Sequence, residues 1–267
     1  MEELPITEVL LLFQSDDESI RSKAQETILA YQAANPILFL QVLFLYLSKS
    51  DHSSTSTDLL AIILAYRTIY ISKNEIFIED NCQLFSNYLT LSSSFFLSTE
   101  NTIRINSAKL FSSIFLNDQM NGNKCQSLQY FYNLVMNPPS ALIIHPILII
   151  ISDYCESELI DHSFISFILN SLNQFFGFED SKVSCFCLEI ISTLLPYMGE
   201  FGESEIGELF NLIIQFCNNE DCRIQAFDTL TVLSQNFYPY FHLFLPILTS
   251  DAFINVVSFN DVSWIAF

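Results

Sequence analysis

The histidines, the Asp161-His162-Ser163 run and the few glycines are where this chain could carry catalytic, metal or phosphate-binding chemistry, and their spacing predicts none. The chain has four histidines, which are His52, His145, His162 and His242. No two of them stand at the spacing of metal ligands. Asp161, His162 and Ser163 are adjacent in the sequence, and adjacency does not give the geometry of a catalytic triad. Five glycines in 267 residues leave no glycine-rich phosphate loop. We therefore expect no enzymatic activity, no cofactor and no bound metal.

The seven cysteines also favour a structural role. Their number is odd and their spacing is wide, which is typical of a reduced intracellular protein rather than of a disulfide framework. Cys185 and Cys187 are two residues apart on a predicted helix, so they do not share a face. We expect these thiols to be buried in the core.

Charge excludes one class of partner. Thirty acidic residues against ten basic ones give a net charge of −20, which repels phosphate backbones, so we expect no nucleic-acid binding. Such a chain suits a basic protein partner, because opposite fields steer association. A plainer alternative is that the charge only keeps an apolar-rich chain soluble. The longest apolar stretches, Pro36–Leu47 and Ala141–Ile151, are shorter than the roughly 20 residues of a spanning helix, so we expect no membrane insertion.

A short signature repeats about every 40 residues, and this period predicts the fold. Each instance opens with an apolar residue, at Ile20, Ala61, Ile103, Ile143, Val183, Cys222 and Val262. Four residues later stands a mostly small residue, at Ala24, Ala65, Ser107, Ile147, Cys187, Ala226 and Ala266. Such a period of helix pairs is typical of HEAT or armadillo repeats. We expect an all-α, right-handed superhelical solenoid of about seven HEAT repeats, forming a single array over residues 1–267. Arrays of this kind are usually binding scaffolds, and we expect a monomer.

Each repeat is expected to hold two antiparallel helices. The first pair covers Thr7–Phe13 and Ser19–Ala33, and the second opens at Pro36 and continues from a Thr57 or Asp58 cap to Ile71. Later helices are expected at Asn74–Leu97, Asn101–Leu116, Cys125–Met136, Ser140–Tyr154, Ile160–Phe176, Ser181–Tyr197, Glu203–Phe216, Asp221–Asn236 and Pro239–Ile254. Pro146 should kink its helix or mark where it truly starts. A last helix opens at Asp261 and stops at the apolar end Trp264–Phe267, so we expect the array to continue in a longer protein.

The order of these motifs resembles the karyopherin-β (importin-β) family of nuclear transport receptors. The first 45 residues are similar to the importin-β N-terminal domain through Leu10–Leu12, Ser15–Glu18, Ile20-Arg21-x-x-Ala24, Gln32–Pro36 and Phe39-Leu40. The C-terminal part is similar through Asp221-Cys222-Arg223-x-x-Ala226, Tyr238–Phe241 and Asp261-Val262-x-x-x-Ala266. The equivalent arginine positions of repeats two, four and five hold Ile62, Ile144 and Ser184 instead.

The resemblance implies three partners and a location at the nuclear pore, in cytoplasm and nucleus. The GTP form of the GTPase Ran would bind the early second helices, with candidate residues Arg21, Gln25, Glu26, Arg67, Arg104 and Lys109. Phe-Gly repeats of nucleoporins would dock between neighbouring first helices, with candidates Ile168, Leu169 and Leu172. Importin-α or basic cargo would bind acidic residues of the late second helices, with candidates Glu189, Glu220, Asp221 and Asp228.

Several alternatives stay open. The chain could be an exportin or a transportin-like import receptor, or a cytosolic HEAT scaffold with no preference for GTP-loaded Ran. Arg21 and Arg104 could serve structure alone, through a bond to an acidic residue in the turn of a neighbouring repeat. Ile168, Leu169 and Leu172 could be ordinary core residues, and the acidic candidates could simply be solvated.

Overall fold

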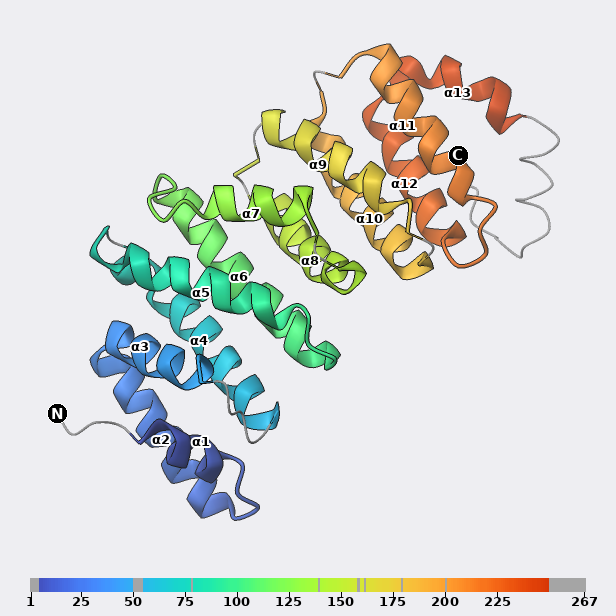
Figure 1. Cartoon of the computed structure of the whole chain (residues 1–267). Coiled ribbons are helices and arrows are strands. Elements are labelled where there is room, and N and C mark those ends of the chain that lie inside the picture. Colours follow the sequence, from blue (N-terminus) through green and yellow to red (C-terminus); the bar gives the residue numbers. More distant parts are fainter. Residues whose placement is uncertain are drawn as a thin grey trace. The chain divides into compact units, whose positions relative to one another are not determined.

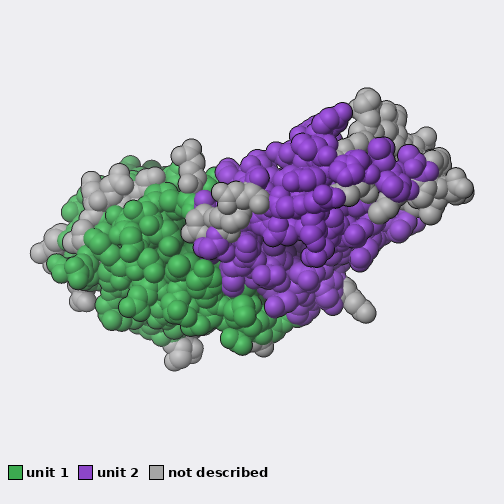
Figure 2. Space-filling view, turned by 90° about the horizontal axis from the view of Figure 1, so that it is seen from above, with its two compact units in different colours: residues 1–159 green, residues 160–267 purple. Residues whose placement is uncertain are grey.

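The computed structural model describes residues 5–49, 55–77, 79–138, 140–157, 159–160, 162–178, 180–199 and 201–249. The described residues fold into helices with no β-strand, which confirms the predicted all-α class (Figure 1). The chain divides into two compact units, Met1–Leu159 and Ile160–Phe267, which Figure 2 shows in green and purple.

Unit 1 is built from helix pairs. Its helices are α1 (Ile6–Phe13), α2 (Glu18–Ala34), α3 (Pro36–Leu47), α4 (Thr55–Ile76), α5 (Cys82–Phe95), α6 (Asn101–Met120), α7 (Ser127–Met136) and α8 (Ile144–Cys155). The 3₁₀ turns η1 (Glu79–Asn81) and η2 (Ala141–Ile143) precede α5 and α8. Within the pairs, α1 packs on α2, α3 on α4 and α5 on α6, while α4, α6 and α8 pack in sequence against one another.

Unit 2 repeats the same plan. Its helices are α9 (His162–Phe175), α10 (Ser181–Leu194), α11 (Glu203–Phe216), α12 (Arg223–Asn236) and α13 (Phe241–Leu248), with 3₁₀ turns η3 (Leu195–Tyr197) and η4 (Tyr238–Tyr240). Helix α9 packs on α10 and α11 on α12, and the second helices α10 and α12 pack on each other.

The repeating signature marks the buried side of the second helix in each pair. The small position is buried wherever the structure describes it, at Ala24, Ala65, Ser107, Ile147, Cys187 and Ala226. Ala266 lies outside the described residues. A side chain with little bulk at this position lets neighbouring helices approach closely, which explains why the signature returns once in each pair.

Helices α2 and α3 start close to the predicted residues, and a side-chain N-cap precedes each of them. The Asp17 carboxylate accepts the N–H groups of Ser19 and Ile20 ahead of α2, and the Asn35 side chain accepts the N–H of Leu38 ahead of α3. Both are N-cap bonds that satisfy otherwise unpaired helix donors. Helix α11 begins and ends at the predicted residues.

Other boundaries were predicted wrongly. Helix α4 starts before Thr57 and Asp58, and both residues are buried acceptors of the Tyr46 hydroxyl, at 2.9 and 3.2 Å, rather than caps. Helix α4 also continues past Ile71 to Ile76, so the residues after Asn74 belong to it and not to the next helix.

Two further predictions concern the later helices. In the fourth pair, α8 starts at Ile144 and not at Ser140, after the η2 turn. Pro146 lies in the first turn of α8, where a missing N–H is tolerated, so it marks the true start of the helix, which was one of the two predicted alternatives. Helix α13 ends at Leu248, and the predicted continuation to Ile254 and the helix opening at Asp261 lie outside the described residues.

Hydrogen bonds between side chains and backbone join consecutive pairs. The buried Tyr88 hydroxyl on α5 donates to the carbonyl oxygen of Leu40 on α3, at 2.7 Å. In unit 2 the buried Thr229 hydroxyl on α12 contacts the carbonyl oxygen of Leu188 on α10, at 3.1 Å. Each bond spans more than 40 residues of sequence, so it fixes the register of one pair on the next.

Candidate protein-binding groove

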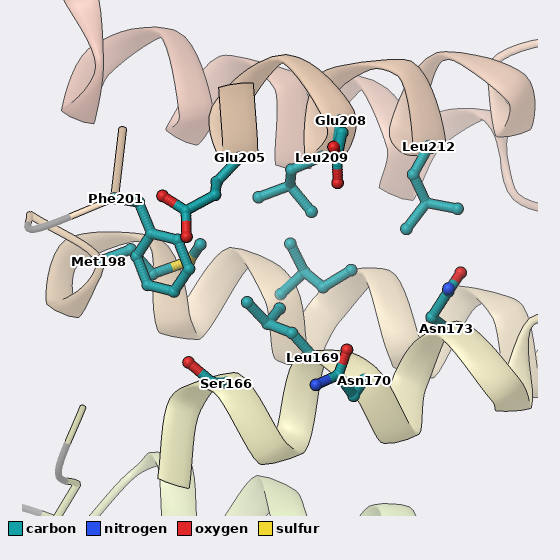
Figure 3. Close-up of a pocket in the computed structure, with 11 residues that line it drawn as sticks. Ser166, Leu169, Asn170, Asn173, Met198, Phe201, Glu205, Glu208, Leu209 and Leu212 are labelled. Carbon is teal, nitrogen blue, oxygen red and sulfur yellow. The ribbon is translucent and has the colours of Figure 1, made fainter. Parts of the chain in front are cut away.

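A groove opens between α9 and α11 in unit 2, with a volume of about 350 Å³ (Figure 3). Its walls and floor are apolar and consist of Leu169, Ile191, Met198, Phe201, Leu209 and Leu212. Its rim is polar and consists of Ser166, Asn170, Asn173, Glu205 and Glu208. Apolar lining with a few polar groups at the edge is the usual composition of a binding pocket, and this volume is at the small end of the usual range. We call this feature the α9–α11 groove.

The floor and the walls of the groove have different origins. Ile191 on α10 and Met198 after η3 are 1% exposed, so the floor is continuous with the core of unit 2. Leu169 on α9 and Leu212 on α11 come from opposite walls of the groove and are only half-buried. When an apolar group binds, half-buried side chains of this kind lose their contact with water. This removal of apolar surface from water is the main source of affinity in such grooves.

Glu205 and Glu208 give the rim a negative charge. The Glu205 carboxylate accepts the backbone N–H of Gly202 at 2.7 Å, so it also caps the start of α11. Glu208 is exposed one turn further along the same helix. The lining contains no lysine or arginine. The groove therefore suits an apolar side chain that has a basic neighbour.

A second hollow of about 390 Å³ lies on the other side of α11, toward α13. Its lining residues are Glu203, Ser204, Gly207, Glu208, Phe210, Asn211 and Phe244. Glu208 belongs to both hollows, and a Glu203 carboxylate oxygen lies 3.9 Å from Nε2 of His242. Helix α11 thus presents carboxylates on both sides of its exposed surface.

The residues predicted for Phe-Gly docking fall in two places. Leu169 lines the groove, whereas Ile168 and Leu172 are fully buried in the core of unit 2. Sequence reasoning missed Met198, Phe201 and Leu212. Leu212 follows Glu208 by one helical turn, so helical spacing on α11 could have found it. Met198 and Phe201 lie between helices, where no periodic pattern applies.

The two arginines proposed as Ran contacts on α2 and α6 bind backbone carbonyl oxygens in the turn before their own helix. Arg21 Nη1 donates to the carbonyl oxygens of Ser15 and Asp16, at 2.7 and 2.9 Å. Arg104 Nη1 donates to the carbonyl oxygens of Ser98 and Thr99, at 2.6 and 3.2 Å. The suggested bond to an acidic side chain in a neighbouring repeat's turn is therefore wrong for these contacts, which tie each helix to the loop before it.

The remaining Ran candidates are exposed and lie on three helices. Gln25 and Glu26 lie on α2, while Arg67 lies on α4 and Lys109 on α6. Helices α4 and α6 pack on each other, so Arg67 and Lys109 are on neighbouring elements.

The residues predicted to hold basic cargo are all exposed. Glu189 lies on α10 and Asp228 on α12, two helices that pack together, and Glu220 and Asp221 lie in the turn before α12. The N-cap residue of α12 is Cys222, and it forms no side-chain cap bond. Asp221 instead donates its N–H to the Asn219 side chain and offers its carbonyl oxygen to Cys185 Sγ, at 3.0 and 3.3 Å.

The described residues give no sign of a metal centre or a membrane helix. Within them, no three histidine, cysteine, aspartate or glutamate side chains lie close enough to share a metal ion. No helix in the described ranges is both long enough and apolar enough to cross a bilayer. His145 is half-buried on α8, and His52 lies outside the described residues.

Comparison with known proteins gives no family. No family model matches the chain, and no curated protein matches it. The solved structures that match include two crystal structures, both described as engineered proteins. One is 12% identical with a TM-score of 0.46, over 87% of this chain and 100% of its own. The other is 10% identical with a TM-score of 0.45, over 86% of this chain and 97% of its own.

Proposed function

We propose that this chain is a protein-binding scaffold without enzymatic activity, and that it acts as a nuclear transport receptor of the importin-β kind. In this proposal the helix pairs form a right-handed solenoid of about seven HEAT repeats. The observation that carries the proposal is the α9–α11 groove, because it offers an apolar floor and an acidic rim between the first helices of consecutive pairs.

The groove suits the aromatic side chain of a Phe-Gly repeat. Six apolar side chains line it, and its volume of about 350 Å³ fits one bulky side chain with its flanking backbone. Phe201 at one end can contact a bound ring edge-to-face, an arrangement that adds to the gain from burial.

Basic cargo or importin-α would be held by carboxylates. The net charge of −20 provides long-range attraction, and Glu189 and Asp228 on neighbouring helices provide local contacts. The GTP form of Ran would bind exposed polar residues of α2, α4 and α6, with Arg67 and Lys109 as the basic contacts. Ran and cargo would exclude each other by overlapping or by favouring different curvatures of the array.

Titration with a Phe-Gly peptide tests the groove. The double variant Leu169→Ser, Leu212→Ser removes one half-buried leucine from each wall, and we expect its affinity for the peptide to fall by about tenfold or more. Ile224→Ser is the control, because Ile224 is 71% exposed and lies on α12 outside the groove lining. Equal affinity of the double variant and the wild-type protein would contradict Phe-Gly docking in this groove.

A second candidate is a cytosolic HEAT scaffold that does not bind Ran. The observation in its favour is that Arg21 and Arg104 are engaged by backbone carbonyls, and a purely structural role accounts for them fully. An exportin or a transportin-like receptor would share the groove and the early helices, and would differ in cargo.

A further inference from the structure

Two cysteines distant in sequence meet in unit 1. Cys82 is the first residue of α5, and Cys125 lies just before α7, 43 residues later. Their sulfur atoms are 3.1 Å apart, with the Cys125 S–H as donor and the Cys82 sulfur as acceptor. Sulfur atoms in such contact can bond with only small movements of either side chain.

The loop around Cys125 is held in an unusual conformation. Asn123 and Gln126 have φ angles of 56° and 57°, the left-handed region that residues other than glycine seldom adopt. These two residues flank Cys125 closely on either side. Such backbone outliers persist only where surrounding bonds enforce them, and they concentrate at functional sites.

The buried carboxylate of Asp118 stabilises the conformation of this loop. Asp118 is fully buried, and its side chain accepts the backbone N–H groups of Cys125 and Ser127, at 2.8 and 3.0 Å. Its carbonyl oxygen accepts the N–H of Asn123 at 2.7 Å. The Cys125 carbonyl oxygen accepts the Ser86 hydroxyl on α5 at 3.3 Å, which holds the loop against the helix that carries Cys82. Cys125 is therefore fixed in place from both sides.

The two thiols differ in access and environment. Cys82 is half-buried and can be reached from solvent, whereas Cys125 is 4% exposed. Burial raises the pKa of Cys125 well above its ordinary value, and the neighbouring Cys82 and Asp118 raise it further. This asymmetry makes Cys82 the thiol that meets an external reagent, and Cys125 the thiol that reacts next, within the protein.

We propose that Cys82 and Cys125 form a redox-active dithiol that low-molecular-weight disulfides such as glutathione disulfide oxidise to an intramolecular disulfide. The Cys82 thiolate attacks one sulfur of glutathione disulfide, forms a mixed disulfide and releases one glutathione. The Cys125 thiol then gives up its proton as its sulfur attacks the Cys82 sulfur, which forms the Cys82–Cys125 bond and releases the second glutathione as a thiol. The protein loses two electrons and two protons, and the reagent becomes two thiols.

The other cysteines are arranged differently. Cys155, Cys187 and Cys217 are buried. Cys185 and Cys222 are also neighbours, and a hydrogen bond with Cys185 adds to the rise that burial causes in the pKa of Cys222. Their S–H groups are directed to the backbone carbonyl oxygens of Asp221 and Ser181, at 3.3 and 3.4 Å, and within the described residues no left-handed residue flanks either of them. A bond at Cys82–Cys125 would tie α5 to the loop between α6 and α7, and so fasten one helix pair to the next.

The test is oxidation of the whole chain by glutathione disulfide, followed by alkylation of free thiols and peptide mapping. We expect a Cys82–Cys125 cross-link that forms at least tenfold faster in the native protein than in urea, because the fold holds the sulfurs together. Cys82→Ser should abolish this cross-link, and Cys185→Ser, which changes a cysteine of similar exposure, should retain it. A cross-link that is absent, or that forms no faster in the native protein than in urea, overturns the proposal.

A trivalent arsenical provides a second readout that needs no oxidation. Phenylarsine oxide bridges two adjacent thiols with loss of water, so its binding reports proximity directly. We expect wild-type protein to take up one equivalent more than the Cys82→Ser variant. Equal uptake by the two proteins would also overturn the proposal.

Discussion

Arg104 on α6 is hydrogen-bonded to the turn that precedes its own helix, since its Nη1 donates to the carbonyl oxygen of Ser98 at 2.6 Å. Arg21 makes the same contact with the Ser15 carbonyl oxygen, and Arg223 Nε donates to the Cys217 carbonyl oxygen at 3.0 Å. In each case the acceptor lies six residues before the arginine. The basic residue of the repeating signature therefore pins a helix to its preceding turn.

Arg104→Ala should lower the free energy of unfolding by about 1–3 kcal/mol, because a charged donor and a half-buried carbonyl oxygen lose their bond. Arg21→Ala should have a smaller effect, since Arg21 is exposed and water can replace the bond. Urea unfolding of both variants measures the difference. An Arg104→Ala protein as stable as the wild type would show that the contact is not a stabilising one.

Glu208→Lys should weaken binding of a peptide that carries a phenylalanine between lysines by about tenfold, because it reverses a charge on the groove rim. The control is Glu79→Lys, which makes the same change in net charge at an exposed site on the η1 turn of unit 1. Calorimetry at low and high salt should show the Glu208 effect shrinking with salt. Equal weakening by both variants would mean that net charge, and not the groove, attracts the peptide.

Asp153→Asn should stabilise unit 1 at pH 7. Burial raises the pKa of Asp153 on α8, the Ser112 side chain on α6 opposes the rise, Glu156 adds to it, and Lys109 on α6 opposes it. Tyr66 on α4 also lies within reach of the Asp153 charge. A carboxyl with a raised folded-state pKa opposes folding when ionised, and this penalty disappears as the pH falls through the folded pKa toward the ordinary value of 3.8.

Thermal unfolding of the wild type and the Asp153→Asn variant between pH 4 and pH 8 tests whether ionised Asp153 destabilises the folded state. The variant should melt higher at pH 7, and the two curves should converge toward pH 4. A variant that melts lower than the wild type at every pH would show that ionised Asp153 is a stabilising partner.

Tyr88→Phe should lower the free energy of unfolding by about 1 kcal/mol, because the buried hydroxyl donates to the Leu40 carbonyl oxygen across two helix pairs. The matched control is Tyr197→Phe, since Tyr197 is 49% exposed. Denaturant unfolding should separate the two variants. Loss of stability in Tyr197→Phe alone would contradict a role for the Leu40 contact.

The sequence predicts the alternation of helices well because burial and spacing coincide at the repeating signature. Ala65, Cys187 and Ala226 lie at the buried position that the period assigns to them. The end of α4 could not be predicted in the same way. The predicted end of this helix is Ile71 and the predicted start of the next is Asn74. The helix instead continues to Ile76, and the following Phe77 stacks on Phe85 of α5 with ring centroids 4.2 Å apart. Tertiary packing outweighs local polarity at that point.

The groove could be predicted only in part. Leu169 was proposed together with Ile168 and Leu172 as an apolar residue of the first helix in the fifth pair, but the fold buries Ile168 and Leu172 in the core. Met198 and Phe201 come from the segment between α10 and α11, and their position depends on how three helices pack. The Cys82–Cys125 contact could not be predicted from the sequence either, because it joins residues 43 positions apart that only the packing of helices brings together.

The most direct test of the proposed function is calorimetric binding of this protein to Ran at physiological salt. Ran would be loaded with a non-hydrolysable GTP analogue in one titration and with GDP in the other. The proposal predicts clear binding of the GTP form, much weaker binding of the GDP form, and loss of affinity in Arg67→Glu. Absence of binding to either form by a folded, helical sample would contradict a transport receptor and favour the cytosolic scaffold.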